Sequence, residues 1–157
     1  MTPHSFDKLN EFESFKNCEV TKMILLHNRL KTFVNWPFDK IKESKCNSLE
    51  LAKTGFIMKN NDDYSPSAQC ICCLKELIWK NDDIPHDKHF ENMPSCVLIN
   101  ILSKKKEVEL TVYDVMHILT MREISNYISK QFSNDKKMRN DVLQYNDDFI
   151  LKTMKKL

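Results

Sequence analysis

Four side chains in the middle of the sequence have the types and the spacing of a metal site. Cys70 and Cys73 form a Cys-x-x-Cys pair. His89 follows after fifteen residues, and Cys96 follows after six more. A tight turn brings two cysteines three positions apart to one point, and zinc binds four sulfur or imidazole ligands in a tetrahedron. Because protein side chains fill all four positions, the pattern predicts one structural Zn²⁺ with no position left for a catalytic water.

Two neighbouring side chains are rival ligands, and a different chemistry is also open. Cys72 would form an unusual Cys-x-Cys pair with Cys70, and His86 lies one helical turn before His89. A catalytic Cys–His pair would make the chain a thiol enzyme, but a thiolate bound to zinc is not a free nucleophile. We therefore predict no catalytic residue and no enzymatic activity.

The composition excludes several other functions. The chain has 157 residues and a formal net charge of +2, which predicts one domain with an appendage and gives no bulk charge for nucleic-acid binding. Gly55 is the single glycine, so a glycine-rich phosphate loop is excluded. No apolar run is long enough to span a bilayer, and the first residues do not resemble a secretory signal. We therefore expect the six cysteines to be kept reduced, without disulfides.

Short elements between residues 23 and 102 must position the four ligands. Helical spacing over Ile24–Val34 ends at Trp36-Pro37, because the residue before a proline avoids the α region. We predict a helix at Ser48–Lys53, capped by Asn47 and Glu50. We expect strands at Phe56–Met58, Cys70–Ile71 and Glu76–Trp79, a helix from Pro85 toward Met93, and a helix or strand at Val97–Leu102. The result is an α+β zinc domain.

The two ends of the chain differ from this domain. Residues 1–22 carry Phe6, Leu9, Phe12 and Phe15 at intervals of three, so they form either a short amphipathic helix capped by Ser5 or a loosely held arm. Residues 103–110 read as a charged linker. Thr111 is a suitable N-cap, with Asp114 three residues later, for a long amphipathic helix over residues 111–157.

That helix carries an apolar stripe with steps of mostly three or four residues. A helix of this length cannot cover its whole stripe against a domain of about 80 residues, so the pattern predicts partner helices. The alternative is a helix that folds back on its own domain or frays after Ser133. The residues expected to face the partners are Val115, Ile118, Met121, Ile128, Phe132 and Val142.

Together these residues resemble the baculoviral inhibitor-of-apoptosis repeat family, whose repeat is the BIR domain. The resemblance covers about residues 26–102 and rests on the following motifs: Arg29-Leu30-Lys31-Thr32-Phe33, Trp36-Pro37, Leu51-Ala52-x-x-Gly55-Phe56, Gln69-Cys70-x-x-Cys73, Leu77, Trp79, and Asp82-Asp83-x-Pro85-x-x-x-His89-x6-Cys96. It implies a short three-stranded antiparallel sheet surrounded by short helices. A single repeat followed by one long helix is similar to the mitotic branch of the family.

What that branch implies about function is specific. Such members are subunits of the chromosomal passenger complex, at centromeres and the spindle midzone in mitosis and otherwise in the nucleus and cytoplasm. Their long helix binds borealin and the inner centromere protein, and through them Aurora B kinase. Their BIR domain reads the free N-terminus of a histone tail that carries a phosphothreonine. Homodimers also occur in the family. A second function is apoptosis inhibition, in which the same groove binds caspases or Ala-first pro-apoptotic peptides.

The resemblance also assigns a peptide groove. Its residues here are Lys75, Leu77, Trp79, Asp82, Asp83 and Asn92. A carboxylate suits a free amine and a lysine suits a phosphate, whereas Asn92 stands in place of a histidine and brings no charge. Other roles are open: Asp82-Asp83 as a cap for the helix at Pro85, Trp79 as a core residue, and Lys75 on a solvated face.

Overall fold

The computed structural model of the chain describes residues 19–154, with side chains up to residue 145. The predicted helix with Phe6 and Ser5 lies outside the described residues. Internal packing divides the chain into two units, Met1–Arg122 and Glu123–Leu157, which are described separately. No helix within residues 19–154 combines the length and the hydropathy needed to cross a membrane.

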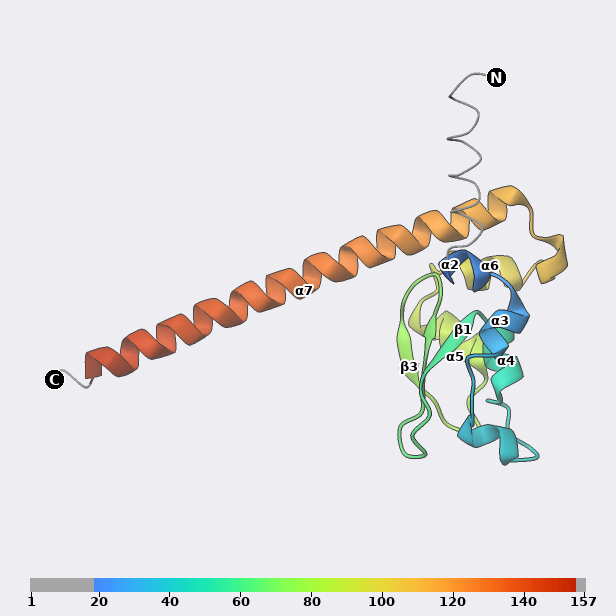
Figure 1. The fold of residues 1–157 in the computed structure, drawn as a ribbon, viewed down its shortest axis with the longest axis horizontal. Helices are drawn as coiled ribbons and strands as arrows, with labels where there is room; N and C mark the ends of the chain where they lie inside the picture. The colour runs from blue at the N-terminus through green and yellow to red at the C-terminus, as the bar shows by residue number, and fades with distance from the viewer. Residues whose placement is uncertain (1–18, 155–157) are drawn as a thin grey trace, which may run out of the picture. The chain divides into compact units, whose positions relative to one another are not determined.

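A three-stranded antiparallel sheet lies at the centre of the first unit (Figure 1). Its strands, in spatial order, are β1 Phe56–Asn60, β2 Ser67–Cys70 and β3 Glu76–Ile78. The register places Phe56 opposite Cys70 and Ala68 opposite Leu77. The sheet confirms the predicted α+β class, although β1 extends beyond Met58 and β2 begins three residues earlier than expected.

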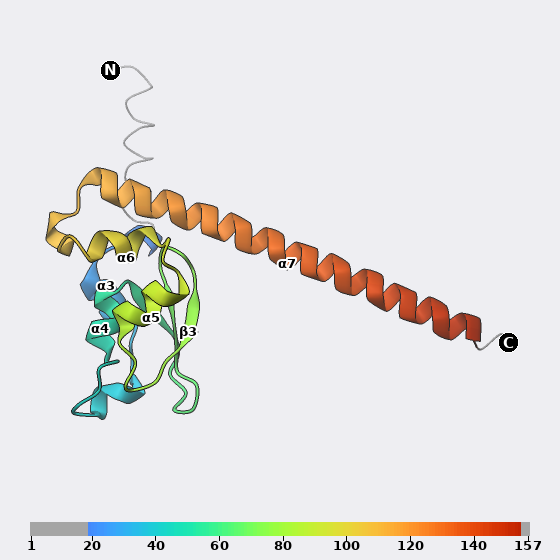
Figure 2. The same ribbon diagram turned by 180° about the vertical axis from the view of Figure 1, so that it is seen from behind.

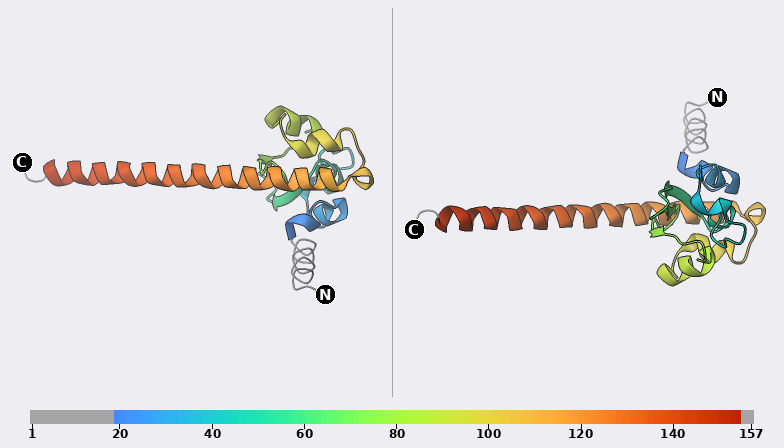
Figure 3. Two further views of the ribbon diagram at one scale, coloured as in Figure 1. Left: turned by 90° about the horizontal axis from the view of Figure 1, so that it is seen from above. Right: turned by 90° about the horizontal axis from the view of Figure 1, so that it is seen from below.

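Short helices surround this sheet. In both views of Figure 3, α2 and α3 (blue) lie on the opposite side of the domain from α5 (yellow-green). The helices are α2 Glu19–Lys22, α3 Leu26–Leu30, the 3-10 helix η1 Pro37–Lys40, α4 Ser48–Lys53, α5 Pro85–Asn92, α6 Val97–Leu102, the 3-10 helix η2 Glu107–Glu109 and α7 Val112–Met154. The expected helix over Ile24–Val34 is therefore too long, because the extended backbone of Leu25 delays the start of α3.

Helix α4 confirms the predicted bounds and the cap by Asn47, whereas the Glu50 carboxylate pairs with Lys53. The Oδ1 atom of Asn47 accepts a hydrogen bond from the backbone N–H of Glu50 at 3.0 Å. Gly55 follows the helix with φ of +90°, a conformation that side chains with a Cβ rarely adopt. A Cβ at this position would also lie 2.3 Å from Leu98 Cδ2, so Gly55 allows α4 to turn into β1 directly beneath α6.

The core fills the space between the sheet and the helices. Phe56 and Trp79 pack edge to face, with their ring centroids 4.9 Å apart. Other fully buried side chains are Trp36, Leu51, Leu98, Ile99 and Ile118. Ile118 comes from α7, so the first turns of the long helix form part of the domain.

The prediction of the partner face was wrong for one residue. Ile118 was expected to face a partner helix, but its side chain is fully buried in the core of the first unit. Val115 and Met121 are half-buried and pack against the same core. Arg122 donates a hydrogen bond to the Ile71 carbonyl oxygen at 2.5 Å. The stripe up to Met121 therefore stabilises the domain.

The start of α7 carries the predicted cap. The Thr111 hydroxyl accepts a hydrogen bond from the Asp114 N–H at 3.2 Å, and the Asp114 carboxylate accepts one from the Thr111 N–H at 2.8 Å. Lys105 forms an ion pair with the same carboxylate at 2.8 Å. The Lys105 ammonium, together with the Thr111 hydrogen bonds, lowers the pKa of Asp114 to about 2.

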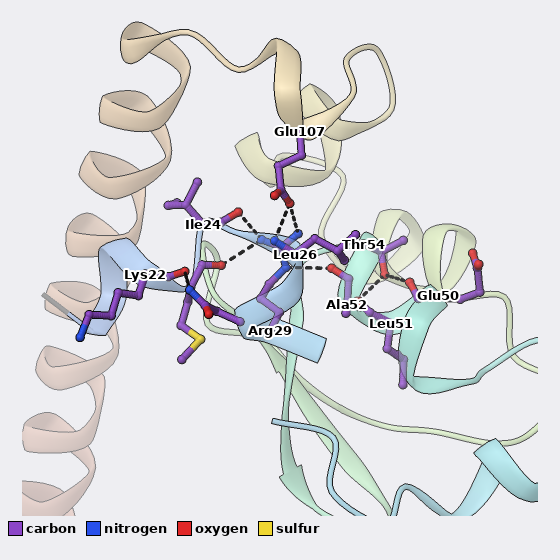
Figure 4. A network of polar contacts seen from close by, with 11 residues as sticks. Lys22, Ile24, Leu26, Arg29, Glu50, Leu51, Ala52, Thr54 and Glu107 are labelled. Atoms are coloured by element: carbon purple, nitrogen blue, oxygen red, sulfur yellow. Dashed lines mark hydrogen bonds and ion pairs between the residues drawn. The ribbon is translucent and has the colours of Figure 1, made fainter. Parts of the chain in front are cut away.

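A buried arginine connects the segment after α6 to the helical side of the domain (Figure 4). Arg29 is 1% exposed, and its Nη2 lies 3.3 Å from the Glu107 carboxylate. The same carboxylate accepts a hydrogen bond from the Leu26 N–H at 2.6 Å. The other guanidinium hydrogen bonds go to the backbone oxygens of Met23, Ile24 and Ala52. Glu107 thus holds η2 against α3.

The exchange of Glu107 for Gln should test this connection. The amide keeps the size of the side chain but removes the negative charge that faces a buried guanidinium, so we expect the free energy of unfolding to fall by about 1–2 kcal/mol. Denaturant unfolding of the metal-loaded protein measures the loss. Glu43→Gln, at an exposed position, is the matched control, and equal losses in the two variants would contradict the prediction.

Candidate metal centre and peptide groove

The first two candidate metal ligands come from β2 and the turn that follows it. Cys70 ends the strand, and the chain reverses because Leu74 adopts a φ of +59°. The Leu74 N–H donates to the Cys70 carbonyl oxygen at 3.1 Å, and the Cys70 N–H donates to the Lys75 carbonyl oxygen at 3.0 Å. This hydrogen-bonded turn holds the sulfurs of Cys70 and Cys73 at one point.

The other two ligands come from the helical side. His89 lies in α5 and is fully buried, and Cys96 directly precedes α6. The Cys70 and Cys96 sulfurs are 3.8 Å apart, and the Cys73 sulfur lies 3.5 Å from His89 Nε2. All four ligand atoms lie within 4.8 Å of one another. The structure therefore brings together the four residues that the sequence pattern singled out.

The backbone after α4 supports both halves of this cluster. His89 Nδ1 lies 3.2 Å from the Thr54 carbonyl oxygen, which can only accept, so Nδ1 carries the proton and Nε2 presents its lone pair to the sulfurs. The next carbonyl, of Gly55, accepts a hydrogen bond from the Ile71 N–H at 3.0 Å. One short segment thus orients the imidazole and anchors the cysteine turn.

Burial favours the protonated form of the Cys70 thiol. It raises the pKa of Cys70 well above the ordinary value, and hydrogen bonds to Cys73 and Cys96 add to this effect. A metal ion requires thiolates, so its binding would release protons from this cluster. Cys46 does not belong to the cluster; burial raises its pKa to about 12, which makes it an unreactive core thiol.

The structure does not bring the two rival ligands into the cluster. Cys72 is buried, and its sulfur lies 3.7 Å from the carbonyl oxygen of Ile118. His86 is exposed, and its ring stacks on Phe90 with centroids 6.4 Å apart. The group of ligand atoms that could share one ion contains neither of them.

The apolar residues assigned to the groove lie at β3 and directly after it. Leu77 is 8% exposed, and Trp79 is only 1% exposed because it packs against Phe56. Trp79 is therefore a core residue, as the alternative interpretation predicted. Among the described residues, Trp79 Nε1 is the one buried side-chain nitrogen or oxygen without a hydrogen-bond partner.

The polar groove residues lie around the same strand. The carboxylate of Asp83 accepts a hydrogen bond from the Lys80 N–H at 2.7 Å. The residue that precedes α5 is Ile84 and no side chain caps the helix, so the alternative that Asp82 and Asp83 cap it is wrong. Lys75 and Asp82 are exposed. Asn92 is also exposed, and its amide donates to a backbone carbonyl of α5 at 2.8 Å.

The sequence analysis missed one residue at this position. Helix α5 lies next to β3 (Figure 2). The ammonium of Lys88, from α5, forms an ion pair with the Asp83 carboxylate at 2.5 Å. The same ammonium donates to the Ile78 carbonyl oxygen at 2.7 Å and lies 5.1 Å from the centroid of the Trp79 ring. The only signal in the sequence is that this lysine precedes His89, a candidate metal ligand.

The described part of the second unit carries exposed apolar side chains. Ile128, Phe132 and Val142 are 46%, 67% and 54% exposed. Further exposed apolar residues on this part of α7 are Ile124, Tyr127, Met138, Leu143 and Tyr145. Three of the six residues predicted to face partners are therefore accessible within this unit.

Comparison with known proteins places these features in a family. Residues 29–100 match the family model of the BIR domain, described as Inhibitor of Apoptosis domain. The chain is 34% identical over 119 residues to baculoviral IAP repeat-containing protein 5, or survivin, of Rattus norvegicus, covering 75% of this chain and 80% of the relative.

Two further relatives give the same result. The Mus musculus protein of the same name is 32% identical over 120 residues, covering 76% of this chain and 82% of its own. Protein 5.2 of Xenopus tropicalis is 36% identical over 98 residues, covering 62% of this chain and 60% of its own. All four ligand atoms come from the region that matches the domain, and the chain belongs to the inhibitor-of-apoptosis family of BIR proteins.

Proposed function

We propose that this chain is a survivin-like, non-catalytic adaptor of the chromosomal passenger complex. The proposal rests on the length of one match. The match to the rat relative covers 119 residues, and the BIR domain ends at residue 100, so the match must include part of the chain beyond the domain. In this proposal the domain reads a phosphorylated histone tail, and α7 binds borealin-like and inner-centromere-protein-like helices. Aurora B kinase is then recruited to centromeres and the spindle midzone.

The ion that the cluster would hold is one structural Zn²⁺. A tetrahedral zinc site with Zn–S bonds of about 2.3 Å has its ligand atoms about 3.8 Å apart. The Cys70 and Cys96 sulfurs are 3.8 Å apart, and the shorter distance of 3.5 Å between Cys73 and His89 Nε2 fits the shorter Zn–N bond. Three thiolates and one imidazole would close the coordination, so the ion would stabilise the fold.

The exchange of Cys73 for Ser should remove this ion. We expect the zinc content to fall from about one ion per chain to near zero and residues 23–102 to unfold, because zinc binding contributes directly to folding. Elemental analysis and circular dichroism measure the two effects. Cys46→Ala, at a buried cysteine outside the cluster, is the control and should keep the zinc. A well-folded wild type without zinc would refute the site.

The chemistry of the groove fits a peptide with a free N-terminus. Asp83 supplies a carboxylate for the amine, and Leu77 at the edge of the core supplies apolar surface for a small first side chain. Lys75 is exposed on the turn before β3 and supplies a positive charge for a phosphate. Asn92 adds no charge, so Lys75 bears the recognition of phosphate.

Titration with a histone-tail peptide, with and without phosphate, and with a pro-apoptotic peptide should separate the two functions considered for this chain. We expect an Ala-first histone-tail peptide to bind about tenfold more tightly with phosphothreonine than without it, since one charge-assisted hydrogen bond contributes about 1.5 kcal/mol. Isothermal titration calorimetry measures the difference. Lys75→Ala should abolish this difference, whereas the control Lys59→Ala, at an exposed position of β1, should keep it.

The opposite outcome would favour apoptosis inhibition. It consists of equal binding with and without phosphate, together with tight binding of an Ala-first pro-apoptotic peptide.

The second unit supplies the surface for partner helices. Exposed apolar side chains recur along α7 from Ile124 to Tyr145, over about six helical turns. An apolar stripe on a helix, here interrupted between Phe132 and Met138, is the surface to which another amphipathic helix packs. The length of this stripe fits helical partners, whereas binding of a short peptide in the groove would not require it.

Substitution of Phe132 and Val142 with Ser should abolish co-elution with borealin-like and inner-centromere-protein-like helices. Both side chains are exposed, so the melting temperature of the domain should not change. Size-exclusion chromatography of the mixture measures complex formation, and Lys130→Ser is the control on the same helix. Intact complex formation by the double variant would contradict the assignment. Truncation before α7 is a poorer test, because it removes Ile118 from the core.

A further inference from the structure

We infer that Lys88 is an internal competitor for the amine-binding end of the groove, and that the N-terminal amine of a peptide must displace its ammonium group in order to bind. This inference rests on the proposed reading of a free N-terminus and adds to it a regulation of the same site.

Three groups surround the Lys88 ammonium. The Asp83 carboxylate lies 2.5 Å from Nζ, the Ile78 carbonyl oxygen lies 2.7 Å from it, and the centroid of the Trp79 ring lies 5.1 Å from it. A carboxylate, a carbonyl oxygen and the face of an indole are the three kinds of group that bind an ammonium in proteins. The structure therefore contains a formed cation site, and a side chain of the same chain occupies it.

An N-terminal amine has the same chemistry as this occupant. Both are compact ammonium groups with three N–H donors and one positive charge. The carboxylate proposed to bind the amine is that of Asp83, and it already forms an ion pair with Lys88. The two side chains are only 21% and 26% exposed, so solvent screens the contact weakly. A second ammonium at this carboxylate would meet the like charge of the first.

The carboxylate keeps its place without the lysine. The Lys80 N–H donates to Asp83 Oδ2 at 2.7 Å, and the Asp83 N–H donates to the Lys80 carbonyl oxygen at 3.2 Å. This turn fixes the acceptor before α5 begins. Removal of the Lys88 ammonium would therefore empty a site that is already formed. The apparent affinity would rise by the inverse of the fraction of time that Lys88 leaves the site open.

The test is calorimetric titration of the zinc-loaded full chain with the phosphothreonine-bearing Ala-first peptide, with either a free or an acetylated N-terminus. Lys88→Met keeps the aliphatic stem and removes the charge, so we expect about tenfold tighter binding of the free-amine peptide. Binding of the acetylated peptide should not change. Lys88→Arg keeps a cation and should bind like the wild type.

The control is Lys59→Met, which removes an exposed lysine from β1 and should leave both affinities unchanged. Zinc content and melting temperature verify the fold of each variant, because Lys88 is adjacent to His89. If Lys88→Met does not hold zinc, Lys88→Gln is used for the same comparison.

The outcomes separate this inference from the function on which it rests. If the wild type binds the free-amine peptide and Lys88→Met binds it equally or more weakly, the ion pair only fastens α5 to β3 and the inference is overturned. An equal gain with the acetylated peptide would overturn it as well. If neither protein binds the peptide, the proposed reading of N-termini fails, and the inference fails with it.

Discussion

The convergence of three sulfurs and one imidazole within 4.8 Å is the constraint on which the first unit depends. Between residues 19 and 111, the strands have three to five residues and the helices at most eight, so each of these elements buries little apolar surface. A bound ion would join the end of β2, helix α5 and the start of α6, which are distant in the sequence. It would also fix the rotation of α5. Because Lys88 and His89 are adjacent, an ion bound by His89 would also hold the lysine beside β3.

The sequence alone predicted the features that are formed by residues close to one another in the chain. The Cys-x-x-Cys turn, the Asn47 cap of α4 and the Thr111–Asp114 cap all depend on residues within four positions of each other. The ion pair between Arg29 and Glu107 joins residues 78 positions apart, and neither has a local pattern that predicts the other. The contact between Lys88 and Asp83 likewise depends on how α5 packs against β3.

Helical periodicity could not distinguish the two uses of α7. A stripe that packs on its own domain and a stripe that binds a partner have the same spacing of three and four residues. Ile118 is fully buried and Ile128 is 46% exposed, although the sequence placed both in one set. Glu107 and the Thr111–Asp114 cap fix where α7 begins, and this start determines which turns of the helix contact the core.

Under the proposed function, the occupied cation site would change which part of a peptide gives selectivity. When a peptide amine replaces the Lys88 ammonium, Asp83 exchanges one charge-assisted contact for another, so this exchange contributes little net free energy. The buried Trp79 offers little further surface to a first side chain. Net affinity must therefore come from contacts beyond the first residue, and exposed Lys75 is the cation available for a phosphate there. Under the proposed function, a lysine that competes at one end of the groove would lower the affinity of every free-amine peptide, so the phosphate would supply a larger share of the remaining binding free energy.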